Sequence, residues 1–486
     1  MKKRIVSLAL AATMTVACMT PLLAGCGDET TDYEHTILFY SSQGKDLQEK
    51  TVEAINSFQA KYPGWKVEHT THGGYDDVKD KISADLQGQG GGLQPDVAYC
   101  YPDHVAQYLQ TEQVININNL INSTDKVKGV DTNPDSETYN QEIEYTVGYS
   151  KDDLADFTKS FWEEGTATNY SGYEKYHYPA DAMLSLPFVK STEVLYYNEK
   201  VLKELNLTPA KTWTEMWEQA AKIKANSKYK AATVLGYDSE ANWFINMCKQ
   251  NGWGYTDIDE NNHFLFNKDN GPLKEWLGTL KNYYSADYGY ITTQNTYGSY
   301  TSALFVSGPE EGGIVYCVGS SGGASHQKPK PNTFTAGVTS IPGSVQADGT
   351  VNSSVISQGP SLVMFNAGHG VSNADEKAKM TFLFIKELLD PVFQASFSKI
   401  SGYNPCRESA YELKSYQDFL ETSDEDIIAA ACKAAMESRK DFFVSPAFVG
   451  SSTARTQVGN VIQYVMKGQR TPEVALNMAY KNCGGK

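Results

Sequence analysis

Extended and helical patterns alternate regularly between residues 35 and 103. Apolar, strand-like runs occupy residues 35–40, 65–69 and 95–101. The two segments between these runs carry apolar residues at helical spacing, and in the first of them Leu47, Ala54, Ile55 and Phe58 fall on one face of a helix. Because this order places helices between successive strands, it predicts a sheet with helices packed on its faces, and we expect a three-layer α/β lobe.

The length of the chain predicts more than one core. A chain of 486 residues is well above the size of about 250–300 residues at which single hydrophobic cores stop growing. With 41% hydrophobic and 21% charged residues, the composition is that of a globular protein with a sizeable core. We therefore expect two lobes.

The N-terminus has the pattern of an exported lipoprotein. Lys2, Lys3 and Arg4 precede an apolar, Ala-rich stretch that ends in Leu-Ala-Gly-Cys at residues 23–26. This ending resembles the bacterial lipobox, which implies cleavage before Cys26 and lipidation of its thiol. Three threonines and a proline in the stretch, and the acidic residues just after it, argue against a transmembrane helix. We predict a signal peptide at 1–25, a tether at 26–34, and a lipid-anchored protein on the extracellular or periplasmic side of the cell membrane.

The negative net charge of the chain limits the classes of molecule that it can bind. Loss of the three N-terminal cations takes the formal net charge from −16 to −19. Nucleic acids and anionic membranes require a basic surface, so we expect no nucleic-acid partner and no membrane contact besides the lipid anchor. The remaining cysteines lack CxxC spacing, which favours buried free thiols over a zinc or redox site.

Two local patterns mark the middle of the chain. Residues 122–150 are polar and, with the following segment, indicate an insertion at about 122–180. Thr212 and Glu215 have the spacing of a capping box, which predicts a helix that begins after Thr212.

Several motifs then form a collinear pattern. The run LPFVKSTEVLYYNEKVLKELNL at residues 186–207, followed by KTWTEMWEQA at 211–220, resembles the family 1 extracellular solute-binding proteins of carbohydrate importers. Weaker matches follow the order of that family, namely the PDV strand at 95–97, GVTSIPG at 337–343 and GYNPCR at 402–407. The resemblance extends from about His35 to the C-terminus, and the insertion departs from it.

The resemblance implies a type II periplasmic-binding-protein-like α/β fold, with two lobes joined by a multi-strand hinge. On this basis we expect lobe 1 at 35–190 and lobe 2 at 191–315. The chain would return to lobe 1 at 316–370, and residues 371–486 would return to lobe 2 and supply the C-terminal helices. We expect crossings between the lobes near residues 187–193, 314–321 and 365–374.

The resemblance also implies a function. By this resemblance, the chain is expected to be a substrate-binding lipoprotein that captures a solute and delivers it to the permease subunits of an ATP-binding cassette (ABC) importer. The expected solute is a mono- or oligosaccharide. Because a transport receptor must bind its solute reversibly, we expect no enzymatic activity, no covalent chemistry and no cofactor. We also expect a monomer and no bound metal. A ligand sensor or adhesin on the same fold is an alternative, since a fold does not determine a function.

A surface glycoside hydrolase is a weaker alternative. Hydrolysis requires two carboxyl groups that flank one glycosidic bond. The acidic pairs at residues 76–77, 152–153 and 310–311 are adjacent in sequence, and adjacent side chains do not face one site together. HExxH and P-loop motifs do not occur in the sequence.

Candidate ligand contacts follow from the expected sheet topology. The carboxyl ends of parallel strands face the crevice of an α/β protein, and a sugar needs flat rings for its C–H face and polar groups for its hydroxyls. The glycine would let backbone N–H groups approach the ligand. This selects Ser42, Gln43, Tyr99, Tyr101, Asp103, Ser320, Ser321 and Gly322.

Four more candidates come from the second half of the chain. Trp243 and Trp253 are possible stacking platforms, with core packing as the alternative for each. The resemblance adds Tyr403 and Arg407 from the second lobe, with Arg407 as a clamp. For Asp103, the alternative role is to cap a helix that begins at His104.

Overall fold

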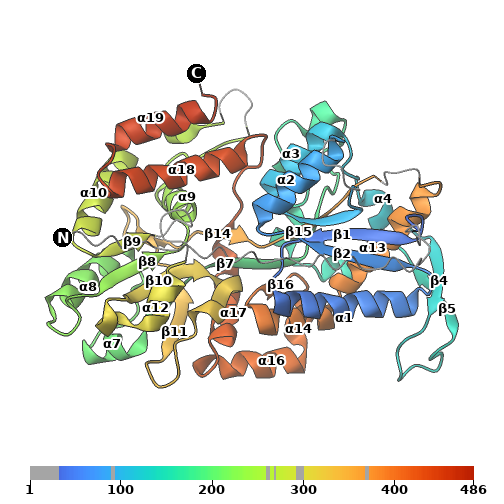
Figure 1. Ribbon diagram of the computed structural model, residues 1–486, viewed down its shortest axis with the longest axis horizontal. Coiled ribbons are helices and arrows are strands. Elements are labelled where there is room, and N and C mark those ends of the chain that lie inside the picture. Colours follow the sequence, from blue (N-terminus) through green and yellow to red (C-terminus); the bar gives the residue numbers. More distant parts are fainter. Residues whose placement is uncertain are drawn as a thin grey trace, which may run out of the picture. The chain divides into compact units, whose positions relative to one another are not determined.

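The computed structural model describes residues 32–88, 94–258, 263–267, 270–291, 300–366 and 371–485. The predicted signal peptide, the lipidation at Cys26 and most of the tether lie outside these residues. Tyr33–Lys486 forms one unit and Met1–Asp32 another. In the larger unit, a five-stranded sheet forms the centre of lobe 1 and an eight-stranded sheet the centre of lobe 2 (Figure 1).

Lobe 1 contains the predicted strand–helix alternation. β1 pairs in parallel with β2 and β3, and α1 and α2 connect the three strands. β15 and β6 complete the sheet in antiparallel pairing, which gives the order β2-β1-β3-β15-β6. The elements are β1 Thr36–Ser41, α1 Lys45–Lys61, β2 Lys66–Thr71, α2 Tyr75–Leu86, β3 Val97–Cys100, α3 Pro102–Tyr108, α4 Asn118–Ile121, β6 Leu186–Pro187, β15 Ser361–Met364, α13 Ala374–Leu388, α14 Pro391–Ser401, α15 Glu408–Glu412 and α16 Lys414–Glu421.

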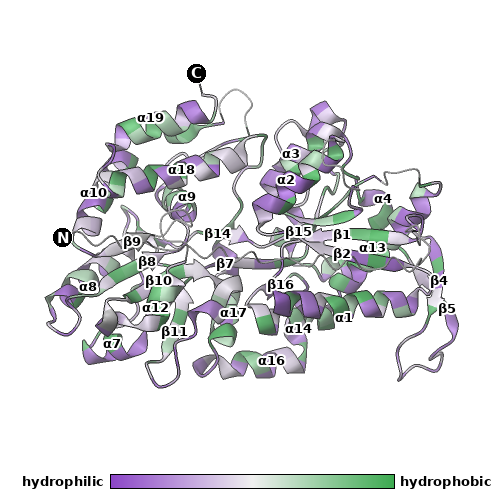
Figure 2. Cartoon of the chain, viewed as in Figure 1, coloured by the Kyte–Doolittle hydropathy of each residue, from purple (hydrophilic) through white to green (hydrophobic). Residues whose placement is uncertain are grey.

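Aromatic packing holds this lobe together. The ring of Phe39 on β1 is fully buried, with ring centroids 5.5 Å from Tyr99 and 5.6 Å from Phe384 of α13. Phe58, on the apolar face of α1, lies 5.5 Å from the same Phe384 ring. Figure 2 shows the corresponding concentration of hydrophobic residues along β1. The helical spacing in the sequence thus identified the buried face of α1.

Lobe 2 is a mixed sheet in the order β17-β14-β7-β10-β8-β9, and β11 and β16 also pair with the long strand β7. Its elements are β7 Val189–Asn198, α7 Glu199–Glu204, α8 Trp213–Ala225, β8 Thr233–Tyr237, α9 Glu240–Asn251, α10 Gly271–Ser285, β9 Gly289–Ile291, α12 Ser302–Ser307, β10 Ile314–Ser320, β11 Ala336–Ser340, β12 Ser344–Val345, β13 Val351–Asn352, β14 Val355–Gln358, β16 Asn404–Pro405, α17 Ile427–Glu437, β17 Phe442–Phe443, α18 Ser451–Met466 and α19 Pro472–Asn482.

Helix α8 begins where the capping pattern predicts. The Thr212 hydroxyl accepts a hydrogen bond from the Glu215 backbone N–H at 3.1 Å. The Glu215 carboxylate accepts from the backbone N–H of Lys211 at 2.8 Å, one residue earlier than in a standard capping box. Two backbone donors without helical partners are therefore satisfied, one in the first turn of the helix and one just before it.

The insertion begins as a charged hairpin. β4 (Lys126–Val130) and β5 (Glu142–Thr146) pair antiparallel, with Lys128 2.7 Å from Glu142 across the strands. Hydrophilic residues cover much of this hairpin (Figure 2). Two short helices follow, α5 Lys151–Ala155 and α6 Lys159–Glu163. Short 3-10 helices lie at Leu109–Thr111, Ala167–Asn169, Tyr173–Tyr176, Leu265–Asn267, Pro309–Glu311, Ser321–Gln327, Thr422–Asp424 and Arg439–Asp441.

The chain passes between the lobes at one of the three expected places. β6 pairs with β15 in lobe 1 and β7 pairs with β10 in lobe 2, so the crossing expected near residues 187–193 is confirmed. The crossing expected at 314–321 is wrong, because these residues form β10 inside the lobe 2 sheet. The second crossing lies instead between β14 and β15, at residues 358–361.

The third crossing also differs from the expectation. The segment at 365–374 leads from β15 to α13, and α13 and α14 pack against α1 within lobe 1. The chain reaches lobe 2 only later, where β16 pairs with β7 and α17 packs against β11. The boundaries expected at 316–370 and 371–486 are therefore misplaced, because strand pairing keeps β10, β11 and β14 in lobe 2 and helix packing keeps α13 and α14 in lobe 1.

Candidate functional site

A cavity of about 590 Å³ lies between the two lobes. On the lobe 1 side, the starts of α2 and α3 line this cavity. On the lobe 2 side, it is lined by the start of α18 and by β14, the strand from which the chain returns to lobe 1. We call this cavity the cleft. Its lining includes Tyr75, Asp76, Tyr101, Asp103, Glu164, Tyr255, Tyr300, Ile356, Ser357, Gln358, Ser445, Ser451, Ser452, Arg455 and Thr456.

The lobe 1 wall is aromatic and acidic. The rings of Tyr75 and Tyr101 lie 4.5 Å apart at 47°, and burial raises the pKa of both phenols above the ordinary value. Both hydroxyls therefore stay protonated and can donate hydrogen bonds. Asp103 follows Tyr101 at the second position of α3, with its side chain 20% exposed. This wall offers ring faces next to a carboxylate acceptor.

The lobe 2 wall carries hydroxyl groups and a cation. Helix α18 begins after Gly450, whose φ of 106° no residue with a Cβ adopts readily. The first two turns of the helix present Ser451, Ser452, Arg455 and Thr456 to the cleft. The Arg455 guanidinium donates a hydrogen bond to Asn242 Oδ1 of α9.

The floor of the cleft contains buried polar atoms that protein contacts leave unused. The hydroxyl oxygens of Ser357 on β14 and of Ser445 are buried without a hydrogen-bond partner among the described residues. An unpaired buried polar group costs about 1–3 kcal/mol. A bound solute or an ordered water can complete the hydrogen bonding of these two groups.

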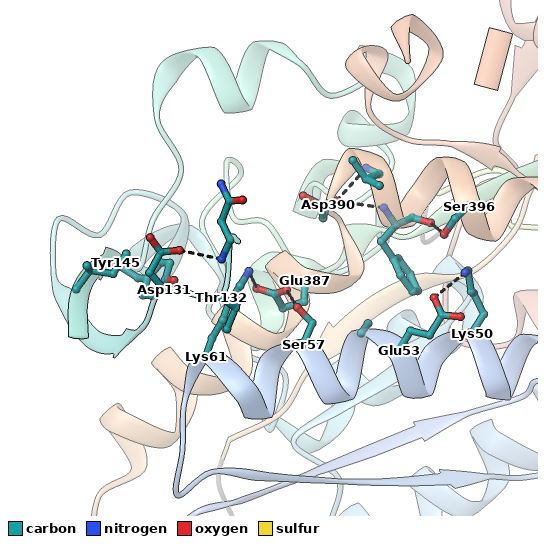
Figure 3. A pocket seen from close by; sticks show the side chains of 15 residues that line it. Lys50, Glu53, Ser57, Lys61, Asp131, Thr132, Tyr145, Glu387, Asp390 and Ser396 are labelled. Carbon is teal, nitrogen blue, oxygen red and sulfur yellow. Dashed lines mark hydrogen bonds and ion pairs between the residues drawn. The ribbon is translucent and has the colours of Figure 1, made fainter. Parts of the chain in front are cut away.

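A second cavity of the same volume, about 590 Å³, lies in lobe 1 between α1, the β4–β5 hairpin and the start of α14. Figure 3 shows that its charged side chains face one another. Lys61 lies 2.6 Å from Glu387, Lys50 lies 2.6 Å from Glu53, and Asp131 accepts a hydrogen bond from Thr138. Because both lysines of this lobe 1 cavity are paired with carboxylates and Asp131 is hydrogen-bonded within the lobe, the cleft is the stronger candidate site.

Two of the sequence-predicted residues, Tyr101 and Asp103, line the cleft. The alternative that Asp103 caps α3 is wrong, because Tyr101 is the N-cap residue and Asp103 lies inside the first turn. Among the described residues, the hydrogen bond that Asp103 accepts comes from its own neighbour, the His104 N–H, at 3.1 Å, and its Oδ1 lies 3.8 Å from His104 Nε2. Its carboxylate therefore retains acceptor capacity for a ligand.

The other strand-end residues of lobe 1 turn away from the cleft. The Gln43 amide donates to the Tyr99 hydroxyl and accepts from Thr51 at 3.0 Å, and both Gln43 and Tyr99 are buried in the lobe 1 core. Ser42 donates to the Gly73 carbonyl at 2.9 Å. These side chains are satisfied within the lobe.

The predicted tryptophan platforms belong to the lobe 2 core. Trp243 is 1% exposed and stacks on Tyr237 at 4.8 Å. Trp253 packs on Trp276 at 5.9 Å. Neither ring lines the cleft, so core packing is the correct interpretation for both.

The turn after β10 packs against the segment after α14. A Cβ on Gly322 would lie only 2.7 Å from the Tyr403 ring, so this glycine makes room for tyrosine and not for a ligand. Its N–H is occupied by Ser320 Oγ at 3.2 Å, and Ser321 is fully buried. Tyr403 lies behind the cleft wall, with its hydroxyl 3.4 Å from that of Tyr75.

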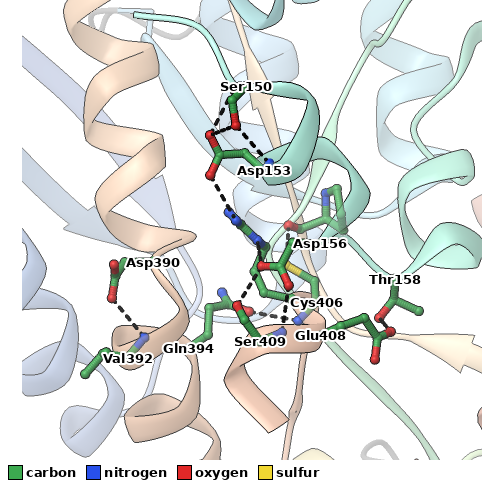
Figure 4. Close-up of polar contacts among 12 residues, drawn as sticks. Ser150, Asp153, Asp156, Thr158, Asp390, Val392, Gln394, Cys406, Glu408 and Ser409 are labelled. Carbon is green, nitrogen blue, oxygen red and sulfur yellow. Dashed lines mark hydrogen bonds and ion pairs between the residues drawn. The ribbon is translucent and has the colours of Figure 1, made fainter. Parts of the chain in front are cut away.

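Arg407, the expected clamp, is part of a structural ion pair. Its Nε lies 2.6 Å from Asp156 Oδ2, and its guanidinium stacks over Phe157 at 4.5 Å. Asp156 also accepts from Ser409 at 2.6 Å (Figure 4). Arg407 is 6% exposed and ties the insertion to α15, so the expectation of a ligand clamp is corrected.

Sequence reasoning missed most of the lobe 2 wall. Arg455, Ser452, Tyr255 and Ser357 carry no motif, and all four are distant in sequence from Tyr101. The one available signal was Gly450 followed by two serines, which is typical of a helix start.

Comparisons with known proteins agree with this architecture. Residues 53–422 match the sequence profile of a family described as bacterial extracellular solute-binding protein. The sn-glycerol-3-phosphate-binding periplasmic protein UgpB of Yersinia pseudotuberculosis is 25% identical over 348 residues, which are 68% of this chain and 72% of that protein. The UgpB protein of Rhizobium meliloti is 26% identical over 338 residues, or 66% and 71% of the two chains.

Solved structures share the fold. UgpB from Mycobacterium tuberculosis in complex with glycerophosphocholine aligns with a TM-score of 0.68 at 16% identity, over 92% of this chain and 97% of that chain. The sugar-binding protein MalE from Xanthomonas citri aligns with a TM-score of 0.64 at 16% identity, over 92% and 96%. The expected α/β periplasmic-binding-protein fold is confirmed.

Proposed function

The chain belongs to the bacterial extracellular solute-binding protein family, and on this premise we propose that its cleft captures a polyhydroxylated solute for an ABC importer. Proteins of this family bind solutes without converting them, so the expectation that the chain is not an enzyme is confirmed. The hydrolase alternative is therefore excluded. Within the proposal, a mono- or oligosaccharide remains the first class to test, followed by esters of glycerol phosphate.

The observation that carries the proposal is the composition of the cleft. Tyr75 and Tyr101 offer ring faces and protonated hydroxyls from lobe 1, and Ser357 and Ser445 offer buried hydroxyls that lack protein partners. A polyol has an apolar C–H face and many hydroxyls, so it complements both features. Relatives with sugars or glycerophosphocholine bound share the fold, which supports the same class of solute.

Delivery to an importer is the second part of the proposal. The structural relatives include an ABC substrate-binding protein from Listeria monocytogenes in complex with cycloalternan. Two lobes joined by several crossing segments can rotate about these segments and close on a solute. A sensor role is the alternative, and loss of solute uptake when the neighbouring permease genes are deleted distinguishes import from sensing.

Membrane anchoring through Cys26 is the third part. Within the described residues, no helix has the length and apolar character needed to cross a membrane. We expect Cys26→Ala to release the protein from the membrane fraction into the medium or periplasm. Wild-type retention of this variant would contradict lipid anchoring.

A thermal-shift screen tests solute capture. Neutral sugars, glycerol phosphate esters, amino acids and dipeptides are added separately to the purified protein. A solute at 100 times its Kd should stabilise the fold by about 2.7 kcal/mol. We expect members of the polyol classes to stabilise, and stabilisation by amino acids or dipeptides alone, or by no solute, would overturn the proposed function.

A further inference from the structure

We propose that the insertion and the segment between β17 and α18 form a latch that holds the two lobes together, separate from the segments that cross between them. The latch consists of Tyr170 and Ser171 of the insertion and of Ala447 and Ile258 on the lobe 2 side. It is a property of the lobes and does not depend on which solute the cleft takes.

The segment at residues 444–450 is attached to lobe 2 at both ends. Before it, β17 pairs with β14, and after it, α18 packs against α9 and α10. Within it, Phe448 is 1% exposed, and its ring stacks on His263 with the centroids 4.2 Å apart. The neighbouring Phe264 packs against the lobe 2 core. We therefore expect this segment to move with lobe 2.

The side chain of Ala447, in the middle of this segment, packs in lobe 1. It is 1% exposed and belongs to the same hydrophobic cluster as Val105, Tyr170 and Leu184 of lobe 1. An apolar side chain in such a cluster is stabilised because it is removed from water. Separation of the lobes exposes Ala447 and the lobe 1 surface that covers it, and this burial therefore opposes opening.

Backbone pairing and a side-chain hydrogen bond reinforce the contact. Tyr170 and Ala447 form a parallel β-bridge, and the Ser171 N–H donates to the Ala447 carbonyl at 2.9 Å. The Ser171 hydroxyl donates to the Ile258 carbonyl at 2.8 Å. One residue of the insertion thus bonds two segments of lobe 2 that are distant in sequence.

Lobe 1 holds the insertion side of the latch in place. The Ala167 N–H donates to the Ala182 carbonyl at 2.8 Å. Tyr170 is 1% exposed, and its hydroxyl lies 3.4 Å from that of Ser185. Because the insertion is packed into lobe 1 next to the latch, a movement of lobe 2 acts on the latch contacts first.

The latch lies beside the cleft. Val444, Ser445 and Pro446 directly precede Ala447 and line the cleft, so release of Ala447 from lobe 1 moves this wall. A latch lowers the fraction of molecules whose cleft is open, and a solute enters only an open cleft. The strength of the latch therefore limits the rate at which a solute enters and leaves.

Native-state hydrogen exchange at single-residue resolution tests the latch on purified protein without added solute. The Ser171 amide bonds across the lobes and the Ala167 amide bonds within lobe 1, so the two amides are matched probes. Ala447→Asp places a carboxylate in an apolar cluster, which opens the latch. We expect the Ser171 amide to exchange about tenfold faster in this variant, while the Ala167 amide keeps its wild-type rate.

Small-angle scattering of the same samples tests whether the lobes separate. We expect a larger radius of gyration for Ala447→Asp than for the wild type. Ala347→Asp is the matched control, because Ala347 is exposed in the turn between β12 and β13 and the substitution adds the same charge. This control should keep the wild-type radius and exchange rates.

A milder variant covers the case in which Ala447→Asp does not fold. Ser171→Ala removes the bond to the Ile258 carbonyl, and the amide at position 171 should exchange faster than in the wild type. Its control is Ser307→Ala, which loses a 3.0 Å hydrogen bond to the Ala303 carbonyl within α12 of lobe 2. The control should leave exchange at position 171 unchanged.

Three results would overturn the inference. If folded Ala447→Asp keeps the wild-type radius of gyration, the latch does not hold the lobes together. If the Ser171 amide of the wild type exchanges only through global unfolding, the contact is permanent and does not open. If Ala447→Asp does not fold, wild-type exchange at position 171 in Ser171→Ala also contradicts the latch. These results leave the proposed function standing, because the solute screen tests it separately.

Discussion

The Lys190 ammonium lies 2.9 Å from the Glu164 carboxylate, and both side chains are almost completely buried. Lys190 is the second residue of β7, just after the chain enters lobe 2, and Glu164 belongs to the insertion and lines the cleft. Lys190 also donates to Ser361 at 3.1 Å. This ion pair therefore ties the insertion to two of the strands that connect the lobes.

Glu164→Gln tests the structural importance of this pair. Removal of one partner leaves a buried, unpaired cation, so we expect a loss of about 3–5 kcal/mol in the free energy of unfolding. Glu163→Gln is the matched control, because the Glu163 side chain is 58% exposed and should change stability by less than about 0.5 kcal/mol. Urea titration of both variants provides the comparison, and equal midpoints would show that the pair is energetically unimportant.

Asp103→Ala should weaken solute binding and spare the fold. Among the described residues the carboxylate accepts one hydrogen bond, from the N–H of its neighbour His104, so its loss costs the apo protein less than about 1 kcal/mol. A lost ligand hydrogen bond to a charged group corresponds to about 1.5–3 kcal/mol, or about tenfold or more in Kd. Apo melting and calorimetric titration measure the two effects. A lower melting temperature with unchanged Kd would remove Asp103 from the site.

Arg407→Gln should have the opposite effect. Its guanidinium is buried against Asp156 and Phe157, so breaking the pair should cost about 3–5 kcal/mol of stability. Solute Kd should stay within about twofold, measured below the melting temperature of the variant. A tenfold loss of affinity at unchanged stability would restore Arg407 as a ligand clamp.

Glu193 should make stability depend on pH. Burial raises the pKa of its carboxyl from 4.5 to about 7. Since the folded state then holds its proton more tightly than the unfolded state, the stabilisation is fully present below pH 4.5 and is lost as the pH rises to 7. The shift corresponds to about 3 kcal/mol.

Glu193→Gln isolates this contribution. Other titrating groups, such as Glu240 with its pKa raised to about 7 by burial, are present in both proteins and cancel in the difference. The stability of the wild type relative to the variant should therefore fall by about 3 kcal/mol between pH 4.5 and 8. Parallel pH profiles from urea titrations would contradict the raised pKa.

Local patterns predicted lobe 1 well because its sheet is built from consecutive elements. The spacing of Ala54, Ile55 and Phe58 identified the buried face of α1. The strand-end rule, which places ligand contacts at the carboxyl ends of parallel strands, correctly selected Tyr101 and Asp103 as residues that line the cleft. The same rule failed for Ser320–Gly322, because Tyr403 from a distant segment covers that turn. A strand-end rule selects an edge of a sheet and does not tell which later segment packs over it.

The lobe 2 wall could not be predicted because long-range crossings assemble it. Arg455 reaches the lobe 1 wall only because the chain passes several times between the lobes, and two of the expected passages were placed at other residues. Trp243 and Trp253 were candidates by residue type alone, and their rings fill the core between α9 and α10. Residue type without topology does not distinguish a stacking platform from a core residue.

The two cavities of equal volume allow a direct test of the account. Tyr101 lines the cleft and Tyr145 lines the lobe 1 cavity, so Tyr101→Ala and Tyr145→Ala are matched variants. The best solute from the thermal-shift screen is titrated calorimetrically into the wild type and both variants. We predict one site per chain, a Kd at least tenfold weaker for Tyr101→Ala, and a Kd within twofold of wild type for Tyr145→Ala. A weaker Kd for Tyr145→Ala with wild-type binding by Tyr101→Ala would place the solute outside the cleft and contradict the account.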